Sequence, residues 1–384
     1  MSPGSNRNPF RFGPLADDES FVDREDELRE LSTQLRSGHD VAVVAPRRYG
    51  KSSLVWRAVQ DLARQGMLIA QVDLMRAPTK ERLAEKLATT IYEEVATPLV
   101  GGRERVEVFA SLRAAPIATV SPETGALSFT FAGRSSGPDL DATIAALLAL
   151  PGRLAAERDR SVAIVLDDFQ EVLTIDSGLL RLMRSVFQDQ PDVAHVYLLG
   201  KRHMLARIFD DENGSFWRSA KQIELRPIAP DRFAAWAAGR FTQTGKALGR
   251  AAAARVMQIT GGHPYATQEL CYFLWQLTPQ SEAADLAGLE AALEGVLRSE
   301  NAHFATVWDH ASAQQRLLLQ ALAAEPGRAL TTDYRRRHDL PSPSTVQSAV
   351  TALEREELVA NERGDVRIVE PFLSEWVRAQ FGAP

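Results

Sequence analysis

The sequence predicts an α/β fold in which helices cover both faces of a parallel sheet, followed by a helical region and a small C-terminal domain. Two observations lead to this prediction. Short apolar segments alternate with amphipathic helical segments from residue 21 to residue 225, which is typical of parallel sheets. The first strand also runs directly into a loop and a helix whose residues suit phosphate binding.

That unit is the stretch Val41–Ser53, which reads VAVVAPRRYGKSS. In such a unit, backbone N–H groups face the phosphates, a lysine supplies the counter-charge and a serine hydroxyl reaches Mg²⁺. Lys51 and Ser52 supply these side chains, whereas Ala45 replaces the first glycine of the pattern G-x-x-x-x-G-K-[ST] and adds a methyl group where the loop turns tightly. We expect a nucleotide to contact Pro46, Arg47, Arg48, Tyr49, Gly50, Lys51, Ser52 and Ser53.

The flanking sequence weighs against the alternative, which is a plain polar loop between a core strand and an amphipathic helix. Apolar residues recur at helical spacing from Leu54 to Leu62, Gly66 suits the end of that helix, and residues 67–74 have the pattern of a second strand. A βαβ unit is therefore predicted. For one of Arg47 and Arg48, pairing with an Asp or Glu is the alternative to nucleotide contact.

A second apolar strand, Val162–Leu166, ends in Asp167 and Asp168. Buried parallel strands have this pattern, and their carboxyl ends are where α/β sheets bind ligands. In a P-loop ATPase the first acid holds the Mg²⁺ shell and the second polarises the attacking water. We therefore expect Asp167 and Ser52 at the metal and Asp168 and Lys51 in catalysis. The alternative is that both acids cap the strand and face solvent.

Composition is that of an ordinary globular chain of two or three domains, with 384 residues, 45% hydrophobic and 24% charged. The single cysteine, Cys271, excludes an intramolecular disulfide and a cysteine-rich zinc site. No apolar run could span a bilayer and the first residues lack the apolar core of a signal peptide, so we expect a cytoplasmic protein with no membrane contact. The net charge of −6 argues against a general nucleic-acid coat protein but is compatible with a local basic surface.

The remaining elements of the first half follow from composition and periodicity. Residues 1–20 are rich in Pro, Gly, Asn and Asp and predict an arm. A helix opens after Phe21 with acids in its first turn, which suits the helix dipole. Amphipathic helices are predicted at 79–97 and 139–158, the second bent at Pro151.

Three further segments have strand patterns. Residues 116–131 alternate apolar and polar around a Pro–Gly turn and predict a β-hairpin inserted in the sheet domain. Residues 193–199 and 221–225 read as additional strands of the parallel sheet.

Five motifs occur in order along the first 280 residues. They are Phe21-Val22-Asp23-Arg24-Glu25, Pro46-Arg47-Arg48-Tyr49-Gly50-Lys51-Ser52-Ser53-Leu54, Asp167-Asp168-Phe169-Gln170, Gly200-Lys201-Arg202-His203 and Thr260-Gly261-Gly262-His263-Pro264-Tyr265. Together they resemble the motifs of the STAND-type branch of the AAA+ P-loop ATPases, in particular the archaeal ATPase-like proteins of prokaryotes. The resemblance implies an ASCE-type α/β core, a helical lid and a C-terminal winged helix-turn-helix. It also implies a nucleotide-driven switch.

With this family pattern the sequence predicts four parts. They are an N-terminal arm at 1–20, a P-loop ATPase core at 21–228 with a β-hairpin insertion near 115–132, a helical lid at 229–300 and a winged-helix domain at 301–384.

The resemblance also implies roles outside the phosphate loop. Val22 and Arg24 belong to a nucleotide-contacting motif. Lys201 or Arg202 takes the place of a polar residue that senses the γ-phosphate. Arg218 precedes the last strand, where AAA+ relatives offer an arginine to a neighbouring subunit's nucleotide. For Lys201, Arg202 and Arg218, the alternative is that each is a solvated surface charge.

A physical argument, independent of the resemblance, also predicts that His263 contacts the nucleotide. Residues 250–260 predict a helix that ends at a glycine, and Pro264 suits the first turn of the next helix. His263 then lies at a helix N-terminus, where a donor can touch a phosphate and link the lid to the nucleotide state. We expect His263 and Pro264 to contact the nucleotide, and the alternative is a plain turn.

Two features bear on the nucleotide and its turnover. Asp168 stands where most relatives carry Glu, and its shorter side chain predicts slow hydrolysis because small displacements of the water-orienting group cost much rate. The guanine-reading pattern Asn-Lys-x-Asp is absent, which favours ATP and ADP over GTP.

The last 80 or so residues predict a winged helix-turn-helix. Its expected elements are helices beginning at Ser312, at Thr331 or Thr332 and at Ser342, strands at 358–360 and 366–369 around a turn at 361–365, and a closing helix around Trp376.

The sequence gives conflicting indications on DNA binding by this domain. Polar residues of the third helix could read base edges, and Arg335-Arg336-Arg337 could meet phosphates. However, residues 301–384 contain 9 Arg against 11 Asp plus Glu, and salt-dependent DNA binding needs clustered cations. The charge count favours protein contact or intramolecular packing. The polar residues of the third helix are Thr345, Gln347, Ser348, Thr351 and Arg355.

Three functional hypotheses follow. The leading one is a slowly hydrolysing ATP-dependent switch that engages a protein partner or another copy of itself. The second is a DNA-binding AAA+ ATPase that acts on duplex DNA through residues 301–384. The third is a nucleotide-binding scaffold that never hydrolyses ATP.

Overall fold

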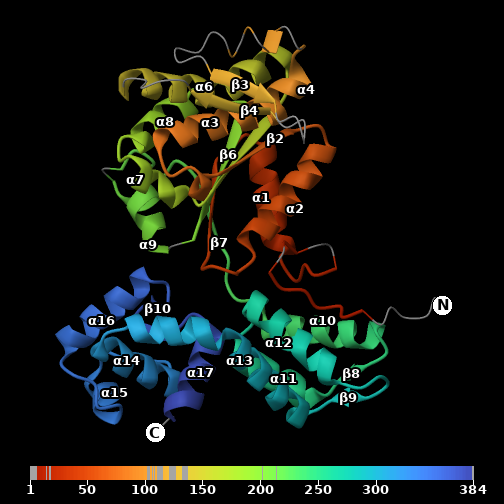
Figure 1. The fold of residues 1–384 in the computed structure, drawn as a ribbon, viewed down its shortest axis with the longest axis vertical. Coiled ribbons are helices and arrows are strands. Elements are labelled where there is room, and N and C mark those ends of the chain that lie inside the picture. Colours follow the sequence, from red (N-terminus) through yellow and green to blue (C-terminus); the bar gives the residue numbers. More distant parts are fainter. Residues whose placement is uncertain are drawn as a thin grey trace. The chain divides into compact units, whose positions relative to one another are not determined.

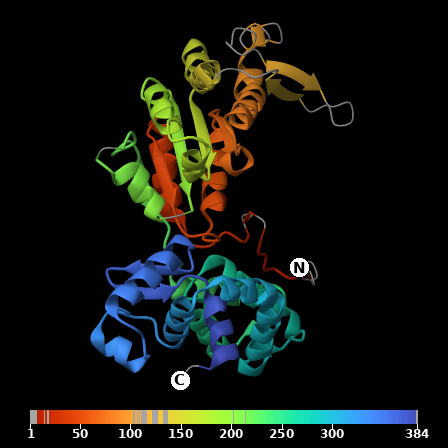
Figure 2. The same ribbon diagram turned by 60° about the vertical axis from the view of Figure 1, so that its left-hand side comes forward.

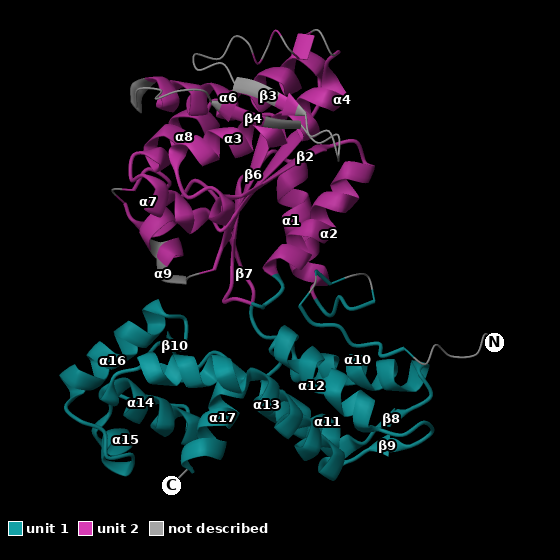
Figure 3. Ribbon diagram, viewed as in Figure 1, with its two compact units in different colours: residues 1–23, 48–50, 226–384 teal, residues 24–47, 51–225 magenta. Residues whose placement is uncertain are grey.

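The computed structural model describes residues 7–382 apart from 14, 17–18, 102–103, 106, 108, 110–115, 121–126, 132–136, 201 and 213. The chain forms two compact units, shown in Figure 3. The sheet unit comprises residues 24–47 and 51–225, and the helical unit comprises residues 1–23, 48–50 and 226–384. The middle of the predicted phosphate loop is therefore grouped with the helical unit.

The sheet unit contains the parallel sheet that the sequence predicts (Figure 1). Its strands are β1 (Val41–Val44), β2 (Leu68–Asp73), β5 (Val162–Asp167), β6 (Val193–Leu199) and β7 (Lys221–Glu224), with a separate pair β3 (Pro116–Val120) and β4 (Leu127–Phe131). Its α-helices are α1 (Glu25–Arg36), α2 (Lys51–Arg64), α3 (Lys80–Thr90), α4 (Thr97–Leu99), α6 (Gly137–Arg158), α7 (Val172–Ile175), α8 (Leu179–Phe187) and α9 (Arg202–Leu205). Short 3₁₀ turns η1 (Leu74–Arg76) and η3 (Phe169–Glu171) and π-helical turns η2 (Ile91–Ala96) and η4 (Ala206–Asp210) complete it.

The strand order is β2-β5-β6-β1-β7, and all neighbouring pairs are parallel. β6 lies between β1, which leads into the phosphate loop, and β5, which ends in Asp167. Every residue of β1 and β6 is buried. Continuous apolar strands of this kind are typical of a parallel sheet covered on both faces.

The strand order determines which face of the sheet each helix covers. From β1 the chain crosses to the edge strand β2, and it then returns in the opposite direction through β5 to β6. Because such crossovers are right-handed, α2 covers one face, and α3, α6 and α8 cover the other. In agreement, α1 packs against α2, whereas α3 and α8 pack against α6.

In the sheet unit, one predicted helix differs in detail and the predicted β-hairpin is confirmed. The helix expected at 79–97 is regular only to Thr90, and a π-helical turn follows. β3 and β4 form an antiparallel pair in which Pro116 faces Phe131, and Figure 2 shows this hairpin outside the parallel sheet. Its Phe129 stacks on Phe109, with ring centroids 5.4 Å apart.

The helical unit begins after β7. Its helices are α10 (Pro230–Gln243), α11 (Arg250–Thr260), α12 (Pro264–Leu277), α13 (Leu286–His310), α14 (Ala313–Ala324), α15 (Thr332–Arg337), α16 (Pro343–Arg355) and α17 (Pro371–Phe381). Its strands are β8 (Ala247–Leu248), β9 (Ala283–Ala284), β10 (Val359–Glu362) and β11 (Asp365–Ile368).

The last part of this unit has the predicted winged-helix elements. Ser312 caps α14 with a reciprocal capping box to Gln315, and the Ser342 hydroxyl caps α16. β10 extends to Glu362 and β11 begins at Asp365, one residue earlier than predicted, so the wing turn is reduced to Arg363 and Gly364, both at positive φ.

One apolar core runs through the helical unit, from the helices after residue 230 to α17. α13 contributes to it over 25 residues and continues unbroken through residue 300, where the sequence predicts a boundary. Phe10 of the predicted arm is buried in the same core against Trp236 and Phe241. Among the described residues, no helix has the length and apolarity needed to cross a membrane.

Candidate functional site

The phosphate-loop lysine lies in the first turn of α2. Its Nζ donates hydrogen bonds to the carbonyl oxygens of Ala45, at 2.7 Å, and Pro46, at 3.0 Å. Ser52 and Ser53 follow in the same turn. The strand β1, the start of the loop and the helix α2 thus form the strand–loop–helix arrangement that the sequence predicts.

Ala45 causes no backbone strain at the position where the pattern has a glycine. Its backbone N–H still donates to the carbonyl of Leu199, at 3.4 Å, and its φ is not positive. The positive φ values of the loop belong to Arg48 and Gly50. Gly50, at φ +85°, is therefore the position whose backbone requires a glycine.

Asp167 ends β5 directly opposite Asp73, which ends β2. Burial is the main cause that raises the pKa of Asp167, and the negative charges of Asp168 and Asp73 raise it further. The ammonium group of Lys51 acts in the opposite direction. Lysine and acid therefore interact at the carboxyl edge of the sheet, where α/β folds bind ligands.

Asp168 is fixed by its neighbours. Its backbone has φ +51°, and its N–H donates to Oδ1 of Asp167 at 3.0 Å. Its own Oδ1 accepts a hydrogen bond from Nε2 of Gln170 at 2.9 Å. Gln170 is only 5% exposed, and its Oε1 accepts from the N–H of Gly200 at 3.3 Å. This amide links the ends of β5 and β6.

Asp73 and Gln170 were not predicted as site residues. Asp73 closes the strand expected at 67–74, so the strand-end argument used for Asp167 applies to it too. Gln170 belongs to one of the five motifs, but the motif gave it no role, because that role depends on Gly200, 30 residues away.

The middle of the phosphate loop packs within the helical unit. The guanidinium of Arg48 lies 4.3 Å from the ring centroid of Tyr265. The buried ring of Tyr49 meets the His263 ring edge-on, with centroids 4.6 Å apart. Arg47 is exposed, and Gly50 is half-buried.

His263 is the N-cap of α12, and Pro264 occupies the first turn, as the sequence predicts. Nδ1 of His263 accepts a hydrogen bond from the N–H of Ala266, so the neutral ring carries its proton on Nε2. Burial, and then the positive charge of Arg48, lower the pKa of His263 to about 3. His263 is thus a neutral donor near pH 7.

The charge of Arg48 acts on the buried Glu269 and on the half-buried Glu370. Burial and the charges of Glu300 and Glu370 raise the pKa of Glu269 to about 8, and burial raises that of Glu370 to about 7. In both cases the charge of Arg48 opposes the increase. Oε2 of Glu269 is buried with no hydrogen-bond partner among the described residues. Arg48 is therefore a loop cation that interacts with acids.

Three further predicted site residues are divided between the two units. Val22 is buried in the core of the helical unit, whereas Arg24 is buried in the sheet unit and pairs with Glu27 at 2.9 Å. Arg218, at φ +50°, lies just before β7, at the amino edge of the sheet and so away from Lys51. Its guanidinium is 4.9 Å from the Trp217 ring centroid.

The side chains of Lys201 and Arg202, two further predicted positions, are not described. Lys201 falls outside the described residues. Arg202 begins α9, and only its backbone is described.

The donor set suits Mg²⁺. No cluster of three or more His, Cys, Asp or Glu side chains able to hold a metal occurs in the described parts of the chain. Mg²⁺ usually needs no such cage, since it binds one or two protein oxygens together with phosphates and water. Ser52 and the half-buried Asp167 offer hard oxygen ligands, and a cation would offset the repulsion by Asp168 and Asp73 that adds to the raised pKa of Asp167.

Comparison with known proteins supports the fold. Residues 302–379 match the family model described as a probable winged helix domain. No curated protein sequence matches the chain. Among solved structures, a Walker-type ATPase of Pyrococcus abyssi is similar with a TM-score of 0.67 and 16% identity, over 96% of this chain and 99% of that one.

A second similar structure is the ORC2 protein of Aeropyrum pernix in ADPNP–ADP complexes. Its TM-score is 0.54 at 15% identity, over 96% of this chain and 98% of that one. At these identities the likeness concerns the fold. The chain therefore has the α/β fold of the AAA+ P-loop ATPases, with a parallel sheet core, a helical region and a C-terminal winged-helix domain.

Proposed function

We propose that this protein is an ATP-binding, slowly hydrolysing molecular switch of the STAND type. One observation carries the proposal: Lys51 and Ser52 at the start of α2 and the acids at the end of β5 occur at one edge of one parallel sheet. The electrostatic interaction between Lys51 and Asp167 supports a shared site. Phosphate binding and phosphoryl transfer need this combination of charges.

In this proposal Lys51 neutralises the phosphates, and Ser52 and Asp167 hold Mg²⁺. Mg²⁺, when bound, offsets negative charge on the phosphates. Asp168 orients the attacking water, and Gln170 fixes the Asp168 carboxylate. The short Asp168 side chain limits its reach, which accounts for slow turnover.

The switch itself uses the packing of residues 48–50 in the helical unit. Tyr49 contacts His263, and Arg367 of β11 interacts electrostatically with the Tyr49 side chain. A nucleotide that reorders this loop would therefore act on α12 and on the wing. His263, with Nε2–H as donor and Pro264 after it, is the proposed reporter of the phosphates. In the same proposal, Arg218 contacts the nucleotide that is bound to a neighbouring copy of the chain.

A protein partner or a second copy is favoured over DNA by the contacts of the arginine triplet. Arg335 donates to the carbonyls of Leu330 and Pro341, at 3.3 and 3.2 Å. Arg336 pairs with Asp333, and Arg337 pairs with both carboxylate oxygens of Glu325. Arginines that already bind carbonyl or carboxylate oxygens contribute less to contacts with DNA phosphates. The winged-helix match keeps duplex DNA as the second candidate.

The test measures ATP binding and phosphate release, with and without duplex DNA. It uses the native chain, Lys51→Ala and Asp168→Asn. We expect Mg²⁺-dependent ATP binding that is lost in Lys51→Ala, and slow phosphate release that is lost in Asp168→Asn and indifferent to DNA. Release stimulated by DNA would establish the second candidate. Binding without any release would establish a scaffold, and no binding would refute the proposal.

A further inference from the structure

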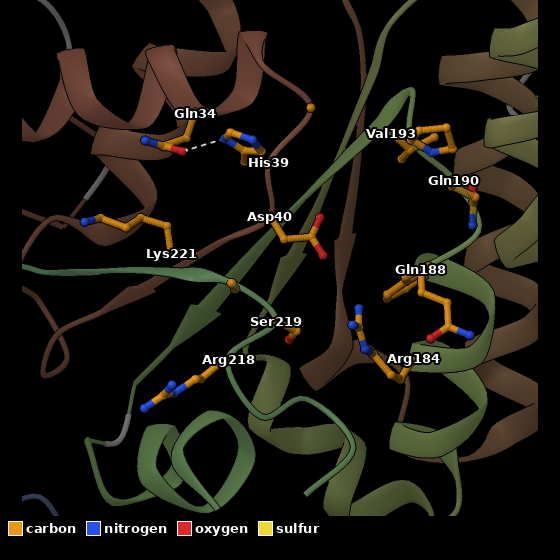
Figure 4. A pocket seen from close by; sticks show the side chains of 14 residues that line it. Gln34, His39, Asp40, Arg184, Gln188, Gln190, Val193, Arg218, Ser219 and Lys221 are labelled. Atoms are coloured by element: carbon orange, nitrogen blue, oxygen red, sulfur yellow. Dashed lines mark hydrogen bonds between the residues drawn. The ribbon is translucent and has the colours of Figure 1, made fainter. Parts of the chain in front are cut away.

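A cavity of about 480 Å³ lies at the amino edge of the sheet, within the sheet unit (Figure 4). Its cations do not converge, because Figure 4 shows Arg218 and Lys221 directed away from Arg184. Its carboxylate, that of Asp40, accepts hydrogen bonds from His195 and from the Tyr197 hydroxyl. The described residues of this cavity therefore do not form a ligand site. The contact that bears on ligand binding lies in the phosphate loop.

The backbone of Arg48, in the phosphate loop, has a conformation that is unfavourable for an arginine. Its φ is +64°, in the left-handed region, where the Cβ of any residue other than glycine comes close to the following carbonyl oxygen. The Arg48 side chain is exposed, so burial in a core does not hold the residue in this conformation. A specific contact of its guanidinium group is available to do so.

The guanidinium of Arg48 lies over the ring of Tyr265, in the first turn of α12. Its central carbon is 4.3 Å from the ring centroid, well inside the limit of about 6 Å for attraction between a cation and an aromatic face. Glu269, one turn further along α12, and Glu370 attract the same guanidinium when they are ionised. The ring and these carboxyl groups thus draw Arg48 to the same part of the helical unit.

The Tyr265 ring is itself held by the N-terminal arm. Phe12 meets the ring edge-on, with centroids 5.6 Å apart, and its centroid also lies 5.3 Å from that of Tyr272. The backbone N–H of Arg11 donates to Oε1 of Gln268 at 3.2 Å, which fastens the arm to the same helix. Tyr265 therefore offers Arg48 an aromatic face in a fixed position.

We propose that Tyr265 is a positioning residue of the nucleotide site, because its ring holds the Arg48 guanidinium and so keeps the phosphate loop in its phosphate-binding conformation. This inference rests on the function proposed above. Arg48 lies three residues before Lys51, so its φ directs the backbone that leads into α2. Backbone N–H groups of such a loop bind phosphates when they converge. Without the ring, Arg48 leaves the left-handed region for part of the time, and the apparent ATP affinity falls in proportion.

ATP binding to the full chain in the presence of Mg²⁺ tests the proposal. Tyr265→Leu removes the ring and should raise the Kd about fivefold, which is about 1 kcal/mol. Tyr265→Phe keeps the ring and should bind ATP within about twofold of the native chain. Tyr272→Leu is the matched control, since it removes another tyrosine of α12 that contacts Phe12, and it should also stay within about twofold. Circular dichroism confirms that each variant is folded.

Variants of Arg48, an exposed residue, separate the backbone effect from the loss of charge. Arg48→Ala keeps a Cβ but loses the guanidinium, so it should raise the Kd as much as Tyr265→Leu does. Arg48→Gly also loses the guanidinium, but glycine adopts the left-handed conformation readily. It should therefore restore the native Kd to within about twofold, with or without Tyr265→Leu. Native affinity in Tyr265→Leu, or equally weak binding in Arg48→Gly and Arg48→Ala, would overturn the proposal.

Trypsin cleavage after Arg47 and Arg48 in the nucleotide-free chain separates this inference from the proposed function. Tyr265→Leu should be cleaved there about fivefold faster than the native chain and Tyr265→Phe, because cleavage requires the loop to open locally. A native chain that binds no ATP would refute the proposed function, and the cleavage rates would then decide whether Tyr265 holds the loop. Equal rates in Tyr265→Leu and the native chain would overturn the inference.

Discussion

Gln170 holds the carboxylate of Asp168 through a hydrogen bond of 2.9 Å from Nε2 to Oδ1. The other end of the same amide accepts from the N–H of Gly200 after β6. The proposed water-orienting acid is therefore fixed from a neighbouring strand, in a backbone conformation with positive φ that few residues adopt. Positioning of this kind is what phosphoryl transfer requires of a protein.

Gln170→Ala should lower the rate of phosphate release by about 10- to 100-fold and leave the Kd of ATP within about twofold. The reason is that Gln170 orients Asp168, and its side-chain hydrogen bonds go to Asp168 and Gly200 and not to the phosphate loop. Single-turnover hydrolysis and equilibrium binding measure the two quantities. Glu171→Gln, one residue further, is the control and should change neither. A loss of ATP affinity that matches the loss of rate would show that Gln170 serves binding and not positioning.

Asp168→Glu should raise the rate of phosphate release several-fold, because the added methylene extends the carboxylate toward the attacking water. The ATP affinity should not change, since the acid acts in the transition state. Steady-state phosphate release at saturating ATP measures the effect. If Asp168→Glu is slower than the native chain, the length of this side chain does not limit turnover.

Gly262→Ala should destabilise the helical unit by several kcal/mol or prevent its folding. A Cβ at Gly262 would come within 2.1 Å of the Ile228 carbonyl oxygen, and φ is +76°. Gly261→Ala is the matched comparison: its φ is also positive, at +57°, but no atom lies within 4 Å of the added methyl, so it should cost about 1 kcal/mol. Denaturant unfolding of both variants measures the difference, and equal costs would refute the steric explanation.

The free energy of unfolding should fall as pH rises from 6.5 to 8. The folded chain keeps a proton on Glu269, with a pKa of about 8, that the unfolded chain releases near 4.5. Glu269→Gln should remove about 2 kcal/mol of this decline, and the decline due to Glu370, with a pKa of about 7, remains.

His263, whose pKa is lowered to about 3, acts with the opposite sign, mainly below pH 6.5, and contributes only about 0.4 kcal/mol between pH 6.5 and pH 8. The carboxyl groups therefore dominate the window from 6.5 to 8. Denaturant unfolding at the two pH values measures the slope, with exposed Glu294→Gln as control. An unchanged slope in Glu269→Gln would show that Glu269 is ionised in the folded chain at neutral pH.

Sequence patterns within short windows correctly predicted the strands and helix starts that depend on neighbouring residues in the chain. The apolar runs of β5 and β6 identified buried parallel strands, and Ser312 and Ser342 identified two helix starts because their hydroxyls cap the first turn. The site residues predicted from Gly-Lys-Ser and from the paired acids follow from the same logic, since strand ends and helix starts meet at one sheet edge.

What sequence reasoning missed depends on contacts between distant segments. The burial of Phe10 in a segment rich in Pro and Gly depends on Trp236 and Phe241. The Arg48 contact with Tyr265 joins residues 217 positions apart. No periodicity within a short window contains this information, because side chains that are far apart in the chain create the environment.

α13 contributes to one apolar core over 25 residues, from the helices after β7 to the winged-helix elements. A helix of that length is about 37 Å long and bends little. It can therefore act as a lever: a tilt of about 5° at one end displaces the other end by about 3 Å. A small rotation of the helices after β7 would then move the winged-helix elements far enough to break or form a surface contact.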